Sequence, residues 1–530
     1  MWNRRLWRLL LAAAAALVPA CSQVRLPSWI VPGPPPTATS SPTRTATDSP
    51  GPTLTPWPAL PTLSEGALGD DDPAAALLPA FAADADLARD LTRYAVDVRV
   101  EFESDSLRAT LTGQARIIYV VPSGETLSDL VLMLWPNDPQ YFATMRAGEA
   151  LINGVRVVGR PELDGIALRF ELAEPAEAGD ALDVSLPFAV DAGGPIGGVV
   201  PKRFGITEGV LAAPTFYPLV PRRIDGAWQV EAAPYGGDTT NSDVATYRVD
   251  VTYPEGLTLA ASGVEIETTT NDDGTRTARY LTGPMRDFAF TLGPHEVDER
   301  TVDGVVVRAL SLPDHAEGAE VMLESAARQL EILNDLVGPY PYPELDVVDV
   351  PGAFGGIEYP GIVFVGTLGT DWVIEPTVHE VAHQWFYALI GGDQLHEPWL
   401  DEALATYAEV LYYEAIGRPG AATGLLSQFR AWLRTHPEPE TPIGRSVAAY
   451  GDPEAYALFV YGKGALFLDA LRGEIGDEAF EAFLHGYYQS QRYGFATGEE
   501  FQQHAEAACG CDLDELFDRW VWEGGQVPGV

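Results

Sequence analysis

The sequence contains few cysteines, few histidines and few basic residues, and each shortage narrows the possible functions. Its 530 residues include 3 cysteines, 8 histidines, and 33 lysines and arginines against 76 aspartates and glutamates. The formal net charge of −43 gives a surface that repels nucleic acids and anionic membranes, so neither is an expected partner. Cys509 and Cys511 are separated by one glycine, so we expect two thiols or a local disulfide without a catalytic use.

The sequence also lacks a long apolar run near its start. Met1–Arg8 carries three arginines, and the apolar run Leu9–Val18 that follows is shorter than the roughly 20 residues that span a bilayer. This pattern predicts a signal peptide over residues 1–20. Val18–Cys21 resembles a bacterial lipobox, which predicts an extracytoplasmic lipoprotein held to the membrane only by an acylated Cys21. A secreted protein with an incidental cysteine is the alternative.

Composition and periodicity divide the rest of the chain into three parts. Residues 21–84 are rich in Pro, Thr and Ser and cannot bury enough apolar surface to fold, which predicts a disordered stalk. Residues 85–312 contain runs such as Tyr94–Phe102 and Tyr247–Tyr253, whose period-two alternation is typical of strands. Residues 313–530 favour a small sheet followed by helices. We therefore expect a multidomain α+β protein with an N-terminal β-sandwich-like domain.

The stretch Thr377–Gly391 carries the strongest chemical signal. It favours an apolar helix with His379 and His383 one turn apart, and residues four apart share a helix face, so both imidazoles can bind one metal ion. The HExxH spacing is typical of a catalytic zinc site in which Glu380 takes a proton from water. Two polar residues on a core helix would be the simpler explanation. The apolar surroundings and the scarcity of histidine favour a single zinc ion instead.

A catalytic zinc needs a third protein ligand. Glu402 stands nineteen residues after His383, which is too far along one straight helix. A helix stop at Gly391–Gly392 and a Pro398 suited to the first turn of a second helix would let the chain turn back. The two antiparallel helices would then bring Glu402 to the histidines. Glu409, two turns further along, can hydrogen-bond a ligand imidazole.

These residues carry a family resemblance. An HExxH motif followed by a distant Glu is similar to the gluzincins, and His379–Trp385 together with Trp399–Glu409 resembles the M1 aminopeptidases. Gly355–Pro360 is similar to that family's Gly-x-Met-Glu-Asn exopeptidase motif, and Val460–Ala465 resembles the block that holds its catalytic tyrosine. The resemblance implies a thermolysin-like zinc metallopeptidase domain, a zinc cofactor and peptide substrates. It also implies a member that lacks the C-terminal helical domain of many relatives.

The resemblance implies roles for further residues. Tyr461 would stabilise the oxyanion that forms at the scissile carbonyl. Glu358 would hold the free amino terminus of a peptide, while Gly355 and Gly356 would let the substrate backbone approach. A solvated surface turn is the simpler explanation of that segment. In the family the β-rich domain forms one wall of the cleft, so we expect Phe216–Pro218 to line it.

The sequence departs from the family pattern near the expected site. Ile357 and Tyr359 stand where the motif has Met and Asn, and Asp401 and Ala403 flank Glu402 where Asn and Gly are usual. The expected activity is hydrolysis of N-terminal residues from peptides. The departures leave open a zinc endopeptidase or another hydrolase on the same site. A surface binding protein that kept the helices as a scaffold is the non-enzymatic alternative.

Overall fold

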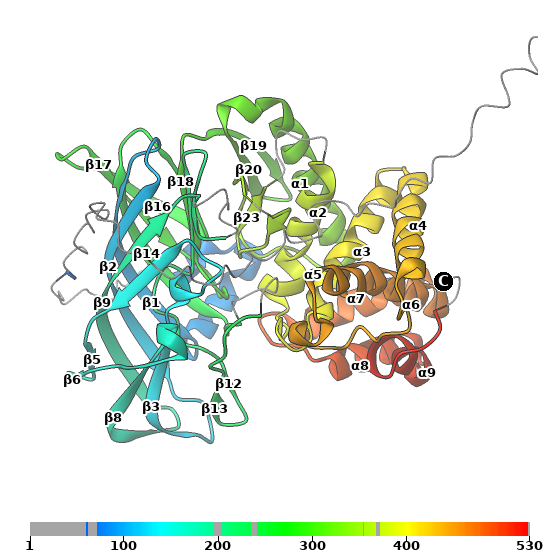
Figure 1. The fold of residues 1–530 in the computed structure, drawn as a ribbon, viewed down its shortest axis with the longest axis horizontal. Coiled ribbons are helices and arrows are strands. Elements are labelled where there is room, and N and C mark those ends of the chain that lie inside the picture. The colour runs from blue at the N-terminus through cyan, green and yellow to red at the C-terminus, as the bar shows by residue number, and fades with distance from the viewer. Residues whose placement is uncertain are drawn as a thin grey trace, which may run out of the picture.

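The computed structural model shows a β-rich part and a helical part, which lie side by side along the long axis of the molecule (Figure 1). The predicted signal peptide, Cys21 and most of the predicted stalk lie outside the described residues. Among the residues that the structure describes, no helix combines the length and the apolar character needed to cross a membrane. The described residues are 60–61, 72–195, 203–234, 241–352, 354–366 and 372–527.

The β-rich part is built on a nine-stranded sheet with the strand order β16-β17-β14-β1-β2-β9-β5-β6, in which β4 also pairs with β9. Strand β1 (Thr92–Phe102) runs parallel to β14 (Ala245–Pro254) and antiparallel to β2 (Arg108–Val120). Every second residue of β1 from Tyr94 to Phe102 is buried, because successive side chains of a strand point to opposite faces. The period-two pattern of the sequence therefore locates this strand correctly.

Two smaller sheets, β3-β8-β7 and β10-β11-β18-β15, pack with the large sheet. Val98 of β1, Leu130 of β3 and Phe290 of β18 belong to one buried apolar cluster, so the predicted β-sandwich-like domain is confirmed. The other strands of this part are β3 (Thr126–Met133), β4 (Ala143–Ala147), β5 (Ala150–Ile152), β6 (Val155–Val157), β7 (Arg160–Glu162), β8 (Ala167–Glu177), β9 (Ala181–Gly193), β10 (Gly205–Thr207), β11 (Val210–Pro214), β12 (Arg223–Ile224), β13 (Ala227–Trp228), β15 (Thr258–Ala261), β16 (Val264–Thr270), β17 (Thr275–Leu281) and β18 (Ala289–Gly293).

Phe216 and Tyr217 belong to this apolar cluster and do not line a cleft. Both residues are 0% exposed, and the Tyr217 hydroxyl donates a hydrogen bond to Oδ1 of Asp287 at 2.8 Å. The prediction that they form a cleft wall is therefore wrong. The two large rings fill the space between the sheets, where aromatic side chains contribute most to packing.

A second, five-stranded sheet has the order β19-β20-β21-β23-β22. The helix α1 (Ala316–Leu336) connects β20 to its parallel neighbour β21. Because β19 and β20 belong to this sheet, the second domain begins near Glu296, earlier than the predicted boundary at residue 313. The β19–β20 hairpin directly follows the strands of the β-rich part, and β21, the partner of β20, lies beyond a helix. Periodicity alone therefore cannot show that the hairpin belongs to the second sheet. The strands are β19 (Glu296–Val302), β20 (Val305–Ser311), β21 (Glu344–Asp349), β22 (Gly356–Ile357) and β23 (Ile362–Val365).

Residues 72–84, which the sequence assigned to the stalk, are part of the folded protein. They include the short 3-10 helix Pro73–Ala76 and the start of a second one, Pro79–Arg89. Leu77 and Phe81 are buried in the apolar cluster of the helical part. The predicted stalk is therefore too long at its C-terminal end, because the apolar residues here contribute to a core that a composition average conceals.

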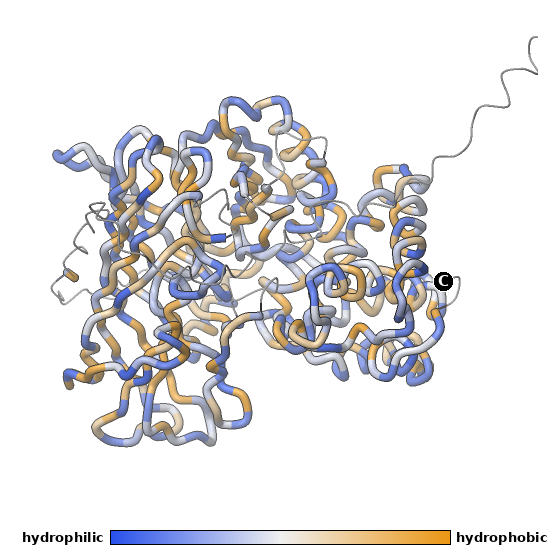
Figure 2. Tube along the Cα trace, viewed as in Figure 1, coloured by the Kyte–Doolittle hydropathy of each residue, from blue (hydrophilic) through white to orange (hydrophobic). Residues whose placement is uncertain are grey.

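The helical part follows the second sheet and shares one apolar cluster with it. Figure 2 shows hydrophilic and hydrophobic residues alternating along these elements, while the tip of the β16–β17 hairpin is hydrophilic. The helices are α2 (Ile374–Ala382), α3 (Trp399–Ala415), α4 (Pro419–Thr435), α5 (Pro453–Tyr456), α6 (Gly464–Ile475), α7 (Asp477–Gln491), α8 (Gly498–Cys509) and α9 (Asp514–Phe517). Cys509 and Cys511 form a disulfide at the end of α8.

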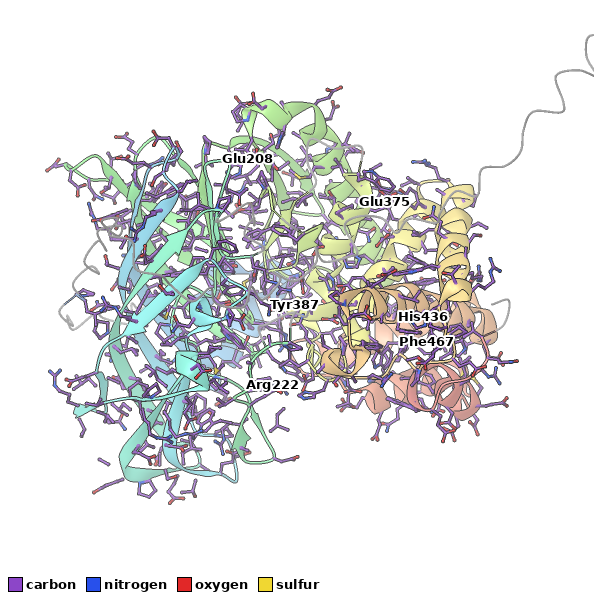
Figure 3. The ribbon with its side chains drawn as sticks, in the orientation of Figure 1. Glu208, Arg222, Glu375, Tyr387, His436 and Phe467 are labelled. Atoms are coloured by element: carbon purple, nitrogen blue, oxygen red, sulfur yellow. A yellow bond between two sulfur atoms is a disulfide. The ribbon has the colours of Figure 1, made fainter. Side chains whose placement is uncertain are left out.

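A buried arginine joins the two parts of the molecule. Arg286, only 1% exposed, donates from Nε to the carbonyl oxygen of Tyr387 at 2.8 Å and from Nη2 to that of Gly494. Its Nη1 donates to Ser242 O at 3.2 Å, and the ring of Phe495 lies 4.4 Å from the guanidinium carbon. Burial lowers the pKa of Arg286 to about 10. Tyr387 lies between the strands and the helices in Figure 3, so this contact fixes the β-rich part against the segment that follows α2.

We expect Arg286→Ala to lower the free energy of unfolding by about 3 kcal/mol or more, because three buried carbonyl groups lose a charged donor. Urea unfolding followed by tryptophan fluorescence measures the change. Arg89→Ala is the control, since the Arg89 side chain is 81% exposed and, within the described part of the chain, pairs with exposed Asp86. Exposed pairs contribute little. Equal unfolding midpoints for the two variants would contradict the role of Arg286.

Candidate metal centre and active site

The helix α2 presents two histidines toward one point. His379 lies in its last turn and His383 is its C-terminal cap. Their Nε2 atoms are 3.1 Å apart. The predicted helix over Thr377–Gly391 is α-helical only as far as Ala382, where α2 ends. Gln384–Leu389 continues as a π-helix that Phe386 and Tyr387 interrupt with non-helical backbone angles. The i, i+4 spacing nevertheless brings both imidazoles to the same face.

Glu402 completes the cluster from the first turn of α3. Pro398 caps that helix, so the chain does turn back between the two motifs. Oε2 of Glu402 lies 3.2 Å from Nε2 of His379 and 3.3 Å from Nε2 of His383. All three residues are buried. Two imidazole nitrogens and one carboxylate oxygen within this span are a donor set for a single zinc ion.

The second ring nitrogen of each histidine is held by a hydrogen-bond acceptor. Nδ1 of His379 lies 3.0 Å from Oε1 of Glu409, and Nδ1 of His383 lies 3.1 Å from the carbonyl oxygen of Phe386. An Nδ1–H that donates to an oxygen leaves the Nε2 lone pair for a metal. The structure therefore places Glu409 behind His379, as the sequence predicts, while the Phe386 carbonyl has no sequence signal.

The electrostatics of the cluster favour positive charge between its members. Burial disfavours charge on His379, but hydrogen bonds to Glu402 and Glu409 outweigh burial and raise the pKa of His379 to about 10. Burial would raise the pKa of Glu402, but its contacts with the two imidazoles lower it below the usual value. A cluster that stabilises positive charge in this way fits a divalent cation, and the ligands release their protons when one binds.

Glu380 is buried beside the two histidines. It is 4% exposed, burial raises the pKa of its carboxyl well above the usual value, and its Oε2 has no hydrogen-bond partner among the described residues. A Cβ added to Gly356 would lie 2.3 Å from Oε1 of Glu380, so a larger residue at that position would displace the carboxylate. The space on the Cβ side of Gly356 is therefore taken by Glu380.

Glu358 follows β22, the edge strand of the second sheet. Ligand atoms of Glu358, Glu380 and His383 lie within 4.8 Å of one another, and all three residues are buried. The neighbouring Gly355 accepts a backbone hydrogen bond from Gly366 at 2.9 Å. The structure thus brings the predicted amino-terminus ligand to the histidines and excludes the solvated surface turn.

Two glutamines that the sequence did not single out hold the Glu358 segment. Oε1 of Gln384 accepts a hydrogen bond from the backbone N–H of Gly361 at 2.8 Å, and Nε2 of Gln384 donates to Tyr359 O at 3.2 Å. Gln394 donates from Nε2 to Oε1 of Glu358 at 3.1 Å. Gln384 directly follows His383, which is a weak sequence signal. No sequence signal marks Gln394, because its contact with Glu358 depends on how the chain turns back between α2 and α3.

Tyr461 lies against the ligand cluster. Its hydroxyl donates to Oε1 of Glu402 at 2.5 Å, and its ring stacks on that of His379 with centroids 5.7 Å apart and planes 13° apart. It belongs to the irregular helical segment Ala457–Lys463, which precedes α6. The tyrosine that only the family resemblance selected is therefore in contact with a predicted metal ligand.

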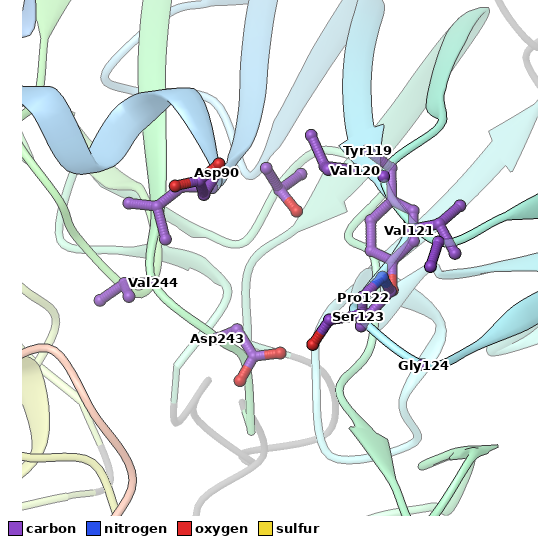
Figure 4. Close-up of a pocket in the computed structure, with 13 residues that line it drawn as sticks. Asp90, Tyr119, Val120, Val121, Pro122, Ser123, Gly124, Asp243 and Val244 are labelled. Atoms are coloured by element: carbon purple, nitrogen blue, oxygen red, sulfur yellow. The ribbon is translucent and has the colours of Figure 1, made fainter.

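A pocket elsewhere on the molecule contains none of the predicted site residues. It has a volume of about 680 Å³ and lies on the β-rich part, where Asp90, Tyr119 and Asp243 contribute to its wall (Figure 4). The triad Glu506, Asp512 and Asp514 also brings three carboxylates together, but two of its members are exposed. Exposed acidic clusters are common in a chain with 76 acidic residues, so neither feature competes with the histidine cluster as an active site.

We expect Glu409→Ala to weaken zinc affinity about 10–100-fold, because the His379 ring loses the acceptor that fixes its orientation. Competition with a chromogenic chelator measures this affinity. Glu414→Ala is the matched control on the same helix, since Glu414 pairs with Arg472 at 2.8 Å. An unchanged affinity in the Glu409 variant would show that this carboxylate does not support the site.

Residues 321–520 match the peptidase family M1 domain. The aminopeptidase M1 of Arabidopsis thaliana is 25% identical over 337 residues, which covers 59% of this chain and 37% of that protein. The aminopeptidase N of Lactococcus lactis subsp. lactis is 27% identical over 259 residues, which covers 45% of this chain and 31% of that protein. This chain therefore spans about a third of the length of these curated relatives.

A solved structure shares the fold. The crystal structure of an M1 zinc metallopeptidase from Deinococcus radiodurans has a TM-score of 0.65 and 23% sequence identity, and the match covers 83% of this chain and 94% of that chain. A mutant of that metallopeptidase, bound to a Tyr-Ser-Ala substrate, has a TM-score of 0.66. These likenesses show a common fold. Over residues 321–520, this chain is therefore similar to the peptidase family M1 domain.

Proposed function

We propose that this protein is a zinc-dependent aminopeptidase that removes N-terminal residues from peptides. One observation carries the proposal: the ligand atoms of His379, His383 and Glu402 meet in a buried cluster, and Glu380 and Glu358 lie beside it. The M1 domain and the aminopeptidase relatives support this activity. The peptide bound to a mutant of the Deinococcus radiodurans metallopeptidase supports a peptide substrate.

Glu380 is the proposed general base and acid. When bound to His379, His383 and Glu402, zinc supplies a Lewis acid that polarises a carbonyl and acidifies water. Glu380 takes the proton of the attacking water and returns it to the leaving amine. The buried Oε2 of Glu380, without a partner among the described residues, is the oxygen that can receive this proton. The absence of a side chain on Gly356 leaves room for the carboxylate at this position.

Tyr461 is the proposed oxyanion donor. Its hydroxyl lies one hydrogen bond from Glu402, so it can turn to an oxygen atom that becomes negative at the same point. A donor beside the reacting carbonyl stabilises the charge that develops on its oxygen. The stacking of the Tyr461 ring on His379 holds the phenol beside the ligand cluster.

Glu358 is the proposed ligand of the substrate's amino terminus. Among the described residues Glu358 forms no ion pair, although it is only 6% exposed. A buried carboxylate without a positive partner is costly, and the protonated amine of a peptide supplies that partner. Its proximity to Glu380 and His383 places the amine next to the reacting centre, so cleavage follows the first residue.

We expect Glu380→Gln to retain one zinc per chain and to lower kcat by about 10²–10⁴-fold, because the amide cannot accept the proton of water. The measurement is hydrolysis of leucyl-aminomethylcoumarin, with and without a chelator, beside its N-acetylated form. Wild-type activity should require zinc and a free amine. Cleavage of the acetylated form as fast as the free form would indicate an endopeptidase, and a zinc-loaded variant of normal activity would remove Glu380 from this role.

We also propose that the protein is exported and anchored to the bacterial envelope through a lipid on Cys21. The basic segment Met1–Arg8, the apolar run Leu9–Val18 and the cysteine that follows support this location. Labelled fatty acid should enter the wild-type protein in cells and should not enter Cys21→Ser. Equal labelling of the two proteins, or none of either, would contradict the lipid anchor.

A further inference from the structure

The side chain of Gln394 lies between two buried carboxylates. Its Nε2 donates to Oε1 of Glu358 at 3.1 Å and to Oδ2 of Asp401 at 3.0 Å. The exposed fraction is 3% for Gln394, 6% for Glu358 and 3% for Asp401. Both partners are acceptors when ionised, so the amide NH2, with its two hydrogens, must face them. One amide therefore serves two carboxylates that would otherwise repel each other.

Asp401 anchors this amide to the metal centre. Oδ1 of Asp401 accepts a hydrogen bond from the backbone N–H of Glu402 at 2.9 Å, in the first turn of α3. A carboxylate is favoured there by the orphan N–H groups of the helix. A continuous chain of hydrogen bonds therefore runs from the backbone of a metal ligand through Asp401 and Gln394 to Glu358.

Glu358 needs such support. Its carboxylate lies close to that of Glu380, and the segment that carries it is a short edge strand followed by a loop. A glutamate side chain has three rotatable bonds, so without a fixed donor its carboxylate would turn away from a second negative charge. The hydrogen bond from Gln394 fixes Oε1 and leaves Oε2 to meet a cation.

We propose that Gln394, anchored by Asp401, is a positioning residue that aims Glu358 at the protonated amino terminus of a peptide. The inference rests on the proposed aminopeptidase activity and deepens it. Gln394 acts through Glu358 and touches no reacting atom. Its loss therefore weakens the binding of substrates with a free amine and leaves the zinc ligands and the proton transfer unaffected.

The test is a double-mutant cycle with Gln394→Met and Glu358→Ala. Methionine keeps the length of the side chain and removes both donors. We expect Gln394→Met to raise KM for leucyl-aminomethylcoumarin about tenfold with a smaller change in kcat, the size of one charge-assisted hydrogen bond. In the Glu358→Ala background the same substitution should change kcat/KM less than twofold, because residues that act as a unit are not additive.

Gln502→Met is the matched control. Nε2 of Gln502 also donates to two carboxylates, those of Glu506 at 3.2 Å and Asp514 at 2.8 Å. These residues are far from the zinc ligands in sequence. The control variant should leave KM unchanged. Asp401→Asn should raise KM, as Gln394→Met does. It replaces the methionine variant in the test if that variant does not fold. Zinc content and urea midpoints confirm that each variant is intact.

Three results would overturn the inference. They are a Gln394→Met enzyme with KM within twofold of wild type, equal losses on free and acetylated substrates, and additive effects in the cycle. If any of these occurs while the wild type hydrolyses free-amine substrates with zinc, only the positioning role falls. A wild type without zinc-dependent hydrolysis of such substrates overturns the proposed function as well.

Discussion

Three donor atoms from two helices meet in a space sealed from water, and the rest of the molecule serves to hold them there. The Nε2 atoms of His379 and His383 and one oxygen of Glu402 lie within 3.3 Å of one another. Such closeness of buried polar groups is stable only when positive charge lies between them, as a proton or as a metal ion. The raised pKa of His379 and the lowered pKa of Glu402 express this requirement.

The same constraint explains features that lie further from the ligands. In the interrupted π-helix after α2, the Phe386 carbonyl accepts from His383, and the next carbonyl, of Tyr387, accepts from the buried Arg286. Arg286 belongs to the β-rich part, so the docking of the two parts and the orientation of a ligand imidazole depend on adjacent peptide groups. The β-rich part therefore contacts the chain one residue away from the carbonyl that orients His383.

Local patterns in the sequence predicted the features that depend on residues close together in the chain. The buried alternation of β1 follows from periodicity, and the metal ligands follow from helical spacing and from the Gly and Pro residues that turn the chain. The family resemblance selected Tyr461, which contacts Glu402.

The errors all involve contacts between distant segments. The domain boundary at residue 313 is too late because β20 pairs with β21 across α1. Beyond Ala382 the helix continues as an interrupted π-helix, in which the Tyr387 carbonyl accepts a hydrogen bond from the distant Arg286. The predicted stalk is too long at its C-terminal end because Leu77 and Phe81 are buried in the core. Gln394 was missed because its two partners meet only after the chain has folded back.

The most direct test is the anomalous scattering of zinc in crystals of the purified protein, recorded on both sides of the zinc absorption edge. The account predicts one strong peak per chain at about 2.0–2.2 Å from Nε2 of His379, Nε2 of His383 and a carboxylate oxygen of Glu402. A zinc-loaded crystal without a peak at this point, or with the Glu402 carboxylate turned away from both imidazoles, would contradict it.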